Sequence, residues 1–184
     1  SETGIVAREG SGIKTAADLV GRKHAVQGIG GTIDVMNKKW VAARGVDYHK
    51  VDWIEMQFPT VPDGLKADLA DAASVVDPFL HRILGAKTGY LIGDFGEVMP
   101  AGTMVVVYAA TRAWASAHQE AVAAFRAALD ESRVFIEDPA NAAKVKASIA
   151  SYVHLPPQAA AFIQIPANLD SHAVPQGLAF WIAT

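Results

Sequence analysis

Short apolar runs rich in β-branched residues alternate with helical patterns through more than half of the chain, and this alternation restricts the fold more than any other feature. Between two of the runs, Ile33, Met36 and Trp40 recur at helical spacing, and Gly45 then provides a C-terminal stop. The alternation favours an α/β fold with a mostly parallel sheet and helices on both faces. The runs predicted to form strands are residues 5–7, 24–27, 51–56, 72–76, 89–92 and 104–109.

Beyond the last of these runs the composition changes, because glycine becomes rare, alanine becomes frequent and the strand patterns stop. Val122, Phe125 and Leu129 mark an amphipathic helix. A second helix is predicted after Asp138, which suits an N-cap because a proline follows it at the first helical position. A third helix is predicted near the prolines at 156–157, and the final stretch, GLAFWIAT, ends in the middle of an apolar pattern.

The composition limits the class of protein. With 184 residues, 51% of them hydrophobic, the chain is long enough for one large or two small domains. Its 16 basic and 19 acidic residues include no basic block, so nucleic acid is not an expected partner. The lack of cysteine excludes disulfides and thiolate chemistry and fits an exported bacterial protein. The first residues, SETGIVAREG, do not read as a signal peptide, so we expect any targeting segment to lie outside this chain.

The stretch HAVQGIGGTIDVM leads from a predicted strand through glycines into a predicted helix. A sharp strand-to-helix turn favours glycine and leaves the first helical N–H groups pointing outward. Together with the positive end of the helix dipole and the hydroxyl of Thr32, the turn at Gly30 and Gly31 suits an oxyanion. Gln27 precedes the glycines and carries an amide donor. We therefore predict Gln27, Gly30, Gly31 and Thr32 as ligand-binding residues.

Other interpretations of this turn remain open. A dinucleotide fingerprint has a glycine where this chain has Ile33, and a Walker loop has a lysine that is missing before Thr32. Asp34 in the first helical turn already complements the helix dipole. The alternative to an anion site is therefore a plain capped turn that binds nothing.

Two further residues follow predicted strands. Asp77 ends the run AASVVD, at the carboxyl end of a strand, where open α/β sheets bind ligands. It suits an amine or a hydroxyl, and an aspartate before Pro78 equally suits an N-cap. Phe58 follows Gln57 after another strand and either lines the same opening or packs in the core. We include Asp77 and Phe58 in the predicted ligand site.

No catalytic residue, metal site or cofactor is predicted from the motifs. The six histidines are scattered without the spacing that places two metal ligands on one helical face. Neither a Gly-x-Ser-x-Gly elbow nor a clustered carboxylate pair is present in the sequence.

The order of several motifs resembles the solute-binding proteins of ABC importers for nitrate, sulfonate, taurine and related anions. The resemblance extends in order over nearly the whole chain and includes the return segment GTMVVVYAATRAW. The motifs that carry it are Asp18-Leu19 with Gly21-Arg22-Lys23, the glycine and threonine turn, Gly45-Val46-Asp47, and the run from Asp71-Ala72 to Asp77-Pro78-Phe79.

This resemblance implies a type II periplasmic-binding-protein-like fold, in which two α/β lobes are hinged around a cleft. It places residues 10–99 in the second lobe, and residues 1–9 and 100–184 in crossover strands and the helical part of the first lobe. In such proteins the turn matching residues 30–32 and the strand end matching Asp77 face the cleft. The family's first strands and helices of lobe one have no counterpart here. We therefore expect an incomplete cleft and exposed apolar surface on the last helices unless self-association covers it.

The resemblance also implies a function. We expect a periplasmic or membrane-tethered component of an ABC importer that captures a small organic or inorganic anion and delivers it to a membrane permease. No enzymatic activity and no cofactor are expected. A related synthase of the thiamine pyrimidine precursor uses the same scaffold with a cysteine-rich motif, which this chain lacks. A ligand-sensing domain of the same fold is a further alternative, and a dinucleotide-binding oxidoreductase is the third.

Overall fold

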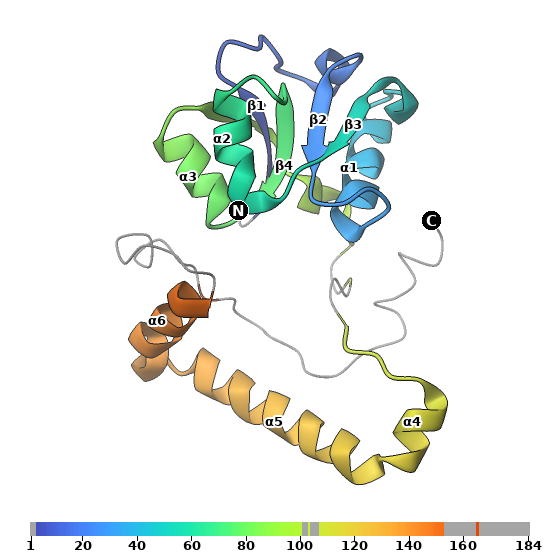
Figure 1. Ribbon diagram of the computed structural model, residues 1–184, viewed down its shortest axis with the longest axis vertical. Helices are drawn as coiled ribbons and strands as arrows, with labels where there is room; N and C mark the ends of the chain where they lie inside the picture. Colours follow the sequence, from blue (N-terminus) through green and yellow to red (C-terminus); the bar gives the residue numbers. More distant parts are fainter. Residues whose placement is uncertain (1–2, 101–102, 104–106, 153–164, 166–184) are drawn as a thin grey trace. The chain divides into compact units, whose positions relative to one another are not determined.

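The computed structural model describes residues 3–100, 103, 107–152 and 165. The chain divides into two compact units, Ser1–Pro100 and Ala101–Thr184. The first unit contains strands β1 (Thr3–Arg8), β2 (Lys23–Val26), β3 (Asp52–Glu55), β4 (Ala72–Val76) and β5 (Gly89–Gly93), with helices α1 (Thr32–Ala42), α2 (Val61–Lys66) and α3 (Phe79–Gly85) (Figure 1). The first five predicted strands are confirmed within a few residues.

The five strands form one sheet in the order β3-β2-β4-β1-β5. β2 pairs with β3 and with β4 in parallel, as expected for strands joined through helices. The prediction of a mostly parallel sheet is wrong for β1, which lies between β4 and β5 and runs antiparallel to both. No α-helix joins β1 to β2, so the helical crossover that imposes parallel pairing is missing there.

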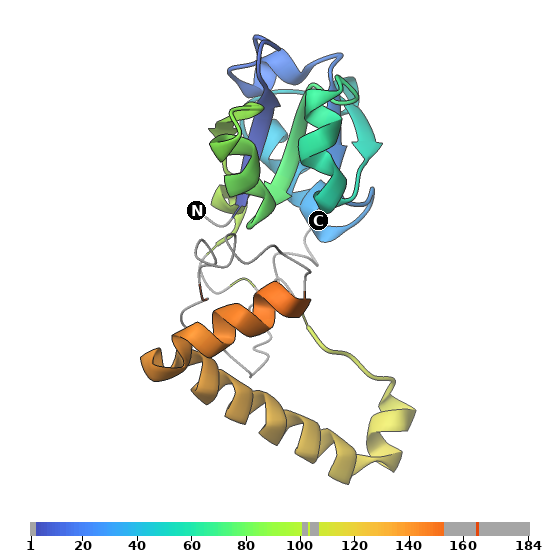
Figure 2. The same cartoon turned by 60° about the vertical axis from the view of Figure 1, so that its left-hand side comes forward.

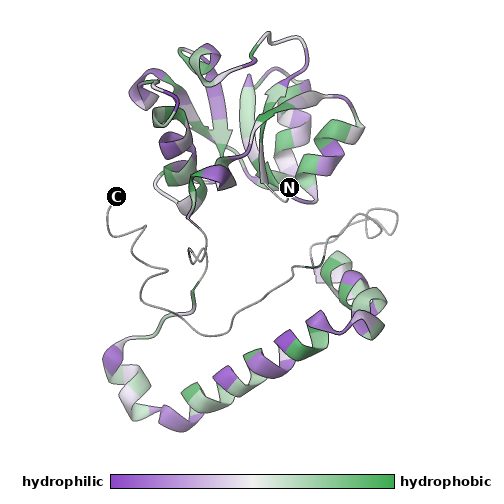
Figure 3. Ribbon diagram, turned by 180° about the vertical axis from the view of Figure 1, so that it is seen from behind, coloured by the Kyte–Doolittle hydropathy of each residue, from purple (hydrophilic) through white to green (hydrophobic). Residues whose placement is uncertain are grey.

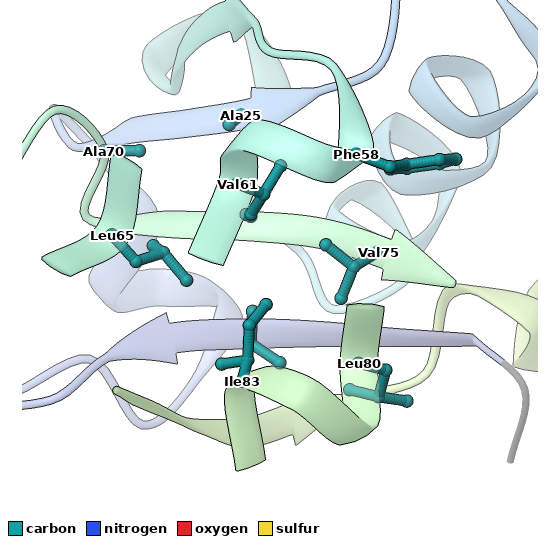
Figure 4. Close-up of a cluster of buried hydrophobic side chains, with 10 residues drawn as sticks. Ala25, Phe58, Val61, Leu65, Ala70, Val75, Leu80 and Ile83 are labelled. Atoms are coloured by element: carbon teal, nitrogen blue, oxygen red, sulfur yellow. The ribbon is translucent and has the colours of Figure 1, made fainter. Parts of the chain in front are cut away.

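Helices cover both faces of the sheet, as predicted (Figure 2). Because side chains alternate along a strand, Ala73 and Val75 of β4 face one side and Ser74 faces the other. α2 and α3 cover the first side, where their apolar residues form the main core (Figure 4). This core consists of Val6, Ala25, Phe58, Val61, Leu65, Ala70, Ala73, Val75, Leu80 and Ile83.

On the opposite face, α1 buries Met36, Trp40 and Val41. Trp40 packs where β5 ends, since a Cβ atom at Gly93 would clash with its indole ring. The predicted helix that carries Ile33, Met36 and Trp40 is therefore confirmed, and its apolar stripe faces the sheet.

The second unit contains α4 (Arg112–Ala117), α5 (Gln119–Glu137) and α6 (Ala142–Tyr152). Asp138 accepts a hydrogen bond from the N–H of Ala140 at 2.9 Å, so its predicted capping role is confirmed. No residue of α5 is buried, and the side chains of Phe125 and Phe135 are exposed. Figure 3 shows hydrophobic and hydrophilic residues alternating along this helix. None of the helices in the described ranges has the length and apolarity needed to cross a bilayer.

The sixth predicted strand is wrong where it can be compared, because residues 107–109 adopt no strand. The described elements of this unit are helices, which offer no sheet edge for pairing. The rest of that run, the helix predicted near residues 156–157 and the final apolar stretch lie outside the described residues. The assignment of residues 1–9, 10–99 and 100–184 to two lobes stays a prediction, with β1 paired inside the first unit.

Candidate functional site

The carboxyl ends of β2, β3 and β4 lie at one edge of the sheet because the three strands run parallel. We call this the strand-end edge and define it as residues 27–32 after β2, residues 55–57 at the end of β3, and Asp77 after β4. Two contacts join its parts. The side-chain amide of Gln57 donates to the carbonyl of Gln27 at 3.1 Å, and Glu55 accepts from the N–H of Ile29 at 2.8 Å.

The turn between β2 and α1 has the geometry that its glycines predict. Gly30 adopts a positive φ of 81°, and the N–H of Gly31 donates to the carbonyl of Gly28 at 3.1 Å. Gly31 is the N-cap of α1, and no side chain caps the helix. Gly30, Gly31 and Thr32 are all exposed, so the first N–H groups of α1 and the Thr32 hydroxyl remain available to an external acceptor.

Asp34 occupies part of this turn from inside the protein. Its carboxylate accepts from the N–H of Gly30 at 2.8 Å and from Lys38 at 2.7 Å, and its side chain is only 1% exposed. The N–H groups of Ile29, Gly30 and Gly31 thus have internal acceptors. The outward-facing donors of the turn come from the start of α1 itself. The sequence indicated the dipole role of Asp34 but not its hydrogen bond to the turn.

Asp77 lies at the end of β4, as predicted, but it is not the N-cap of α3. Pro78 takes that position, so the proline stands one place earlier than predicted for a first helical residue. Asp77 instead accepts from the backbone N–H of His81 at 3.3 Å and pairs with the His81 ring at 2.5 Å. Its second oxygen is buried and has no hydrogen-bond partner among the described residues. His81 is not among the residues predicted from the sequence. An aspartate and a histidine four residues apart at the start of a helix predict such a contact.

Phe58 belongs to the core and not to the surface of the strand-end edge. It is 9% exposed, and its ring lies 6.0 Å from that of Phe79 in a stacked arrangement. Of the two roles that the sequence left open for this residue, the structure shows the packing role. Its part in a ligand site stays a prediction.

Behind the strand-end edge, three polar side chains that the sequence reasoning missed are buried between the sheet and α1. His24, Asn37 and Ser74 are each at most 1% exposed. The ring Nε2 of His24 lies 2.7 Å from the Ser74 hydroxyl, which is 2.5 Å from the side-chain oxygen of Asn37. Burial lowers the pKa of His24 to about 3, so its ring is neutral at physiological pH. Within the described residues, no group of three or more histidines and carboxylates is arranged for a metal ion.

A model of the NMT1-like family matches residues 7–150. The chain belongs to the NMT1-like family. Over 124 residues, this NMT1-like chain is 30% identical to the nitrate/nitrite binding protein NrtA of Synechococcus elongatus. That alignment covers 65% of this chain and 27% of the relative.

Solved structures show the fold of this NMT1-like chain. The periplasmic aliphatic sulphonate binding protein SsuA from Escherichia coli matches 87% of the chain with a TM-score of 0.69 and 19% identity. The periplasmic nitrate-binding protein NrtA from Synechocystis PCC 6803 matches 85% with a TM-score of 0.72 and 18% identity. The chain therefore has the periplasmic-binding-protein fold. It spans 53% and 44% of the lengths of these two structures.

Proposed function

We propose that this NMT1-like chain is the substrate-binding component of an ABC-type importer, or the part of one that these residues form. Its ligand is a small anion of the sulfonate, taurine, nitrate or carboxylate class. Membership of the family supports this proposal, together with relatives that are named as nitrate-binding and sulfonate-binding proteins. The component acts in the periplasm or tethered to the membrane facing outward, delivers its ligand to a membrane permease and performs no bond chemistry.

One observation carries the choice of an anion. α1 begins at an exposed glycine turn with no side-chain cap, at the edge where three parallel strands end. The N–H groups of a helix N-terminus and its dipole favour a negatively charged group. We assign the anionic group to the N–H groups of the first turn of α1, which begins at Thr32, and to the Thr32 hydroxyl, with Gln27 beside them. Asp77, whose second oxygen has no hydrogen-bond partner within the part of the chain that the structure describes, accepts from a donor elsewhere on the ligand.

The proposal is tested by measuring ligand binding to the full chain by calorimetry. Nitrate, ethanesulfonate, taurine and acetate represent the candidate classes, and NAD represents the dinucleotide alternative. We expect at least one anion to bind and NAD not to bind. Binding of NAD alone would sink the transport proposal.

Thr32→Val tests the site itself because it removes the hydroxyl at nearly constant volume. Thr88→Val is the matched control, since Thr88 directly precedes β5 and its hydroxyl makes a long hydrogen bond of 3.4 Å to the Ile83 carbonyl. We expect Thr32→Val to lower the affinity for the anion at least fivefold with little change in the free energy of unfolding. Thr88→Val should leave the affinity unchanged. If both variants bind like the unsubstituted chain, Thr32 is not a ligand contact.

A further inference from the structure

Three elements each contribute one polar side chain to the apolar layer between α1 and the sheet. His24 comes from β2, Ser74 from β4 and Asn37 from α1, and all three are at most 1% exposed. Burying polar groups is costly unless they are hydrogen-bonded, and apolar residues of similar shape are often at least as stable in such places. A hydrogen-bonded polar cluster fixes the orientation of the elements that carry it, because a hydrogen bond depends on the angle between its partners and an apolar contact does not.

The direction of each hydrogen bond in this cluster follows from one fixed acceptor. The carbonyl of Ile33 accepts only, so the end of the Asn37 amide that lies 2.7 Å from it is the NH2 group. The other end of that amide is therefore the oxygen, which must accept, so the Ser74 hydroxyl donates to it. Since Ser74 has a single proton, it accepts from His24, and His24 carries its proton on Nε2.

The chain of hydrogen bonds ends at the first turn of α1. It runs from β2 through β4 to the carbonyl of Ile33, one residue after Thr32. β2 leads into the glycine turn and β4 leads into Asp77, so the two strands that end at the ligand-facing residues are tied to the start of the helix. The apolar contacts of Met36, Trp40 and Val41 hold α1 against the sheet, but they leave its rotation less restricted.

We propose that His24, Ser74 and Asn37 are positioning residues, which fix the first turn of α1 on the sheet so that its N–H groups keep a constant place relative to Asp77. This inference rests on the proposed function for its ligand, and it also predicts properties of the chain without ligand. None of the three side chains contacts the ligand, because all are buried beneath the turn.

The first test needs no ligand. Nitrogen-15 NMR of the full chain at pH 7 will show His24 neutral with its proton on Nε2. Ser74→Ala breaks the chain of hydrogen bonds that joins His24 to Asn37. We therefore expect the rate of amide hydrogen exchange to rise at Val35, in the first turn of α1, and to rise at least tenfold less at Val41, near the other end of the helix. Val75→Ala is the control, because Val75 is buried on the same strand and faces the opposite side of the sheet. It should quicken exchange at both positions alike.

The second test uses ethanesulfonate, or whichever anion binds the unsubstituted chain. Ser74→Ala should lower the affinity for that anion at least fivefold. Val75→Ala should bind it as tightly as the unsubstituted chain does, at temperatures where both variants are folded. Equal affinities of the two variants, a proton on Nδ1 of His24, or uniform exchange in Ser74→Ala would each overturn the positioning role. If no anion binds the unsubstituted chain, the proposed function fails, and the exchange and NMR results still decide the inference.

Discussion

The carboxylate of Asp34 accepts a hydrogen bond from the backbone N–H of Gly30 at 2.8 Å, so a negative charge of the protein already lies at the turn where we place the ligand's anionic group. Asp34 is 1% exposed, and its charge is balanced in part by Lys38 at 2.7 Å. One oxygen of Asp34 is buried without a hydrogen-bond partner among the described residues. The hydrogen bond to Asp34 thus orders the turn without a ligand, but the negative charge of Asp34 weakens the attraction of the turn for anions.

Asp34→Asn should strengthen anion binding. Asparagine keeps an oxygen that can accept from Gly30 but removes the charge that repels the ligand, and charges separated by a few ångströms at a partly buried site interact by about 1 to 3 kcal/mol. We expect affinity for the anion, measured by calorimetry, to rise about tenfold. Stability should fall by about 1 kcal/mol, because the helix loses an acidic residue in its first turn.

Asp52→Asn is the matched control for this change. Asp52 begins β3, at the opposite end of the strand, and its side chain is exposed. The same change in net charge should leave affinity almost unaltered there. An Asp34→Asn variant that binds no better than Asp52→Asn would show that the anion does not lie near this turn.

Gly30→Ala should destabilise the protein by about 1 to 2 kcal/mol, because a left-handed backbone conformation is unfavourable for a residue with a Cβ atom. Gly30 has a φ of 81°, and a Cβ added there meets nothing within 4 Å, so strain of the backbone is the expected cause. Gly28→Ala is the control, since it too lies in open space but is not among the positive-φ glycines of the structure. Urea unfolding should separate the two variants, and equal stabilities would contradict the argument.

Local patterns predicted the elements of the first unit well, because helix and strand periodicity are properties of short segments. The spacing of Met36 and Trp40 describes one face of a helix, and the run AASVV describes a strand that is buried on both faces. The position of β1 was not predictable in this way. Its own residues suit an edge strand and a central strand equally well. Its antiparallel position between β4 and β5 depends on pairing with strands that are far away in the sequence.

The candidate site was predictable to the same extent. Parallel pairing brings the carboxyl ends of strands to one edge, so Gln27, the glycine turn and Asp77 follow strands that end at the strand-end edge. Their part in binding a ligand stays a prediction. The buried chain of hydrogen bonds among His24, Ser74 and Asn37 is not predicted by the sequence patterns. Each of these residues is unremarkable in its local sequence, and only the packing of α1 on the sheet brings them together.

His24 should make the protein less stable as the pH falls below about 6.5, the ordinary pKa of histidine. Burial lowers its pKa to about 3 in the folded protein, so between these values the unfolded chain binds a proton that the folded chain does not. The unfolded state is therefore favoured progressively as pH falls, by about 1.3 kcal/mol between pH 7.5 and pH 5.5. His24→Gln removes this contribution, so urea unfolding followed by circular dichroism should show a correspondingly smaller loss in that variant.

His49→Gln serves as the control for the pH experiment. His49 is exposed on the surface, paired with Asp47 at 2.9 Å. Its replacement should leave most of the pH dependence of the unsubstituted protein in place. If His24→Gln loses stability between pH 7.5 and pH 5.5 as steeply as His49→Gln does, the buried ring is not the source of the dependence.

The apolar stripe of α5 should make the chain associate with itself. Val122, Phe125 and Leu129 share one face of the helix, and Phe125 is 47% exposed in the described structure. Phe125→Glu places a charge in the middle of that stripe and should shift the chain toward monomer in sedimentation velocity experiments across a tenfold range of concentration. Ala127→Glu adds the same charge on the opposite face of the helix and should leave association intact. Since burying an exposed apolar stripe is the driving force, a chain that is monomeric at every concentration, or two variants that associate equally, would show that this face has another role.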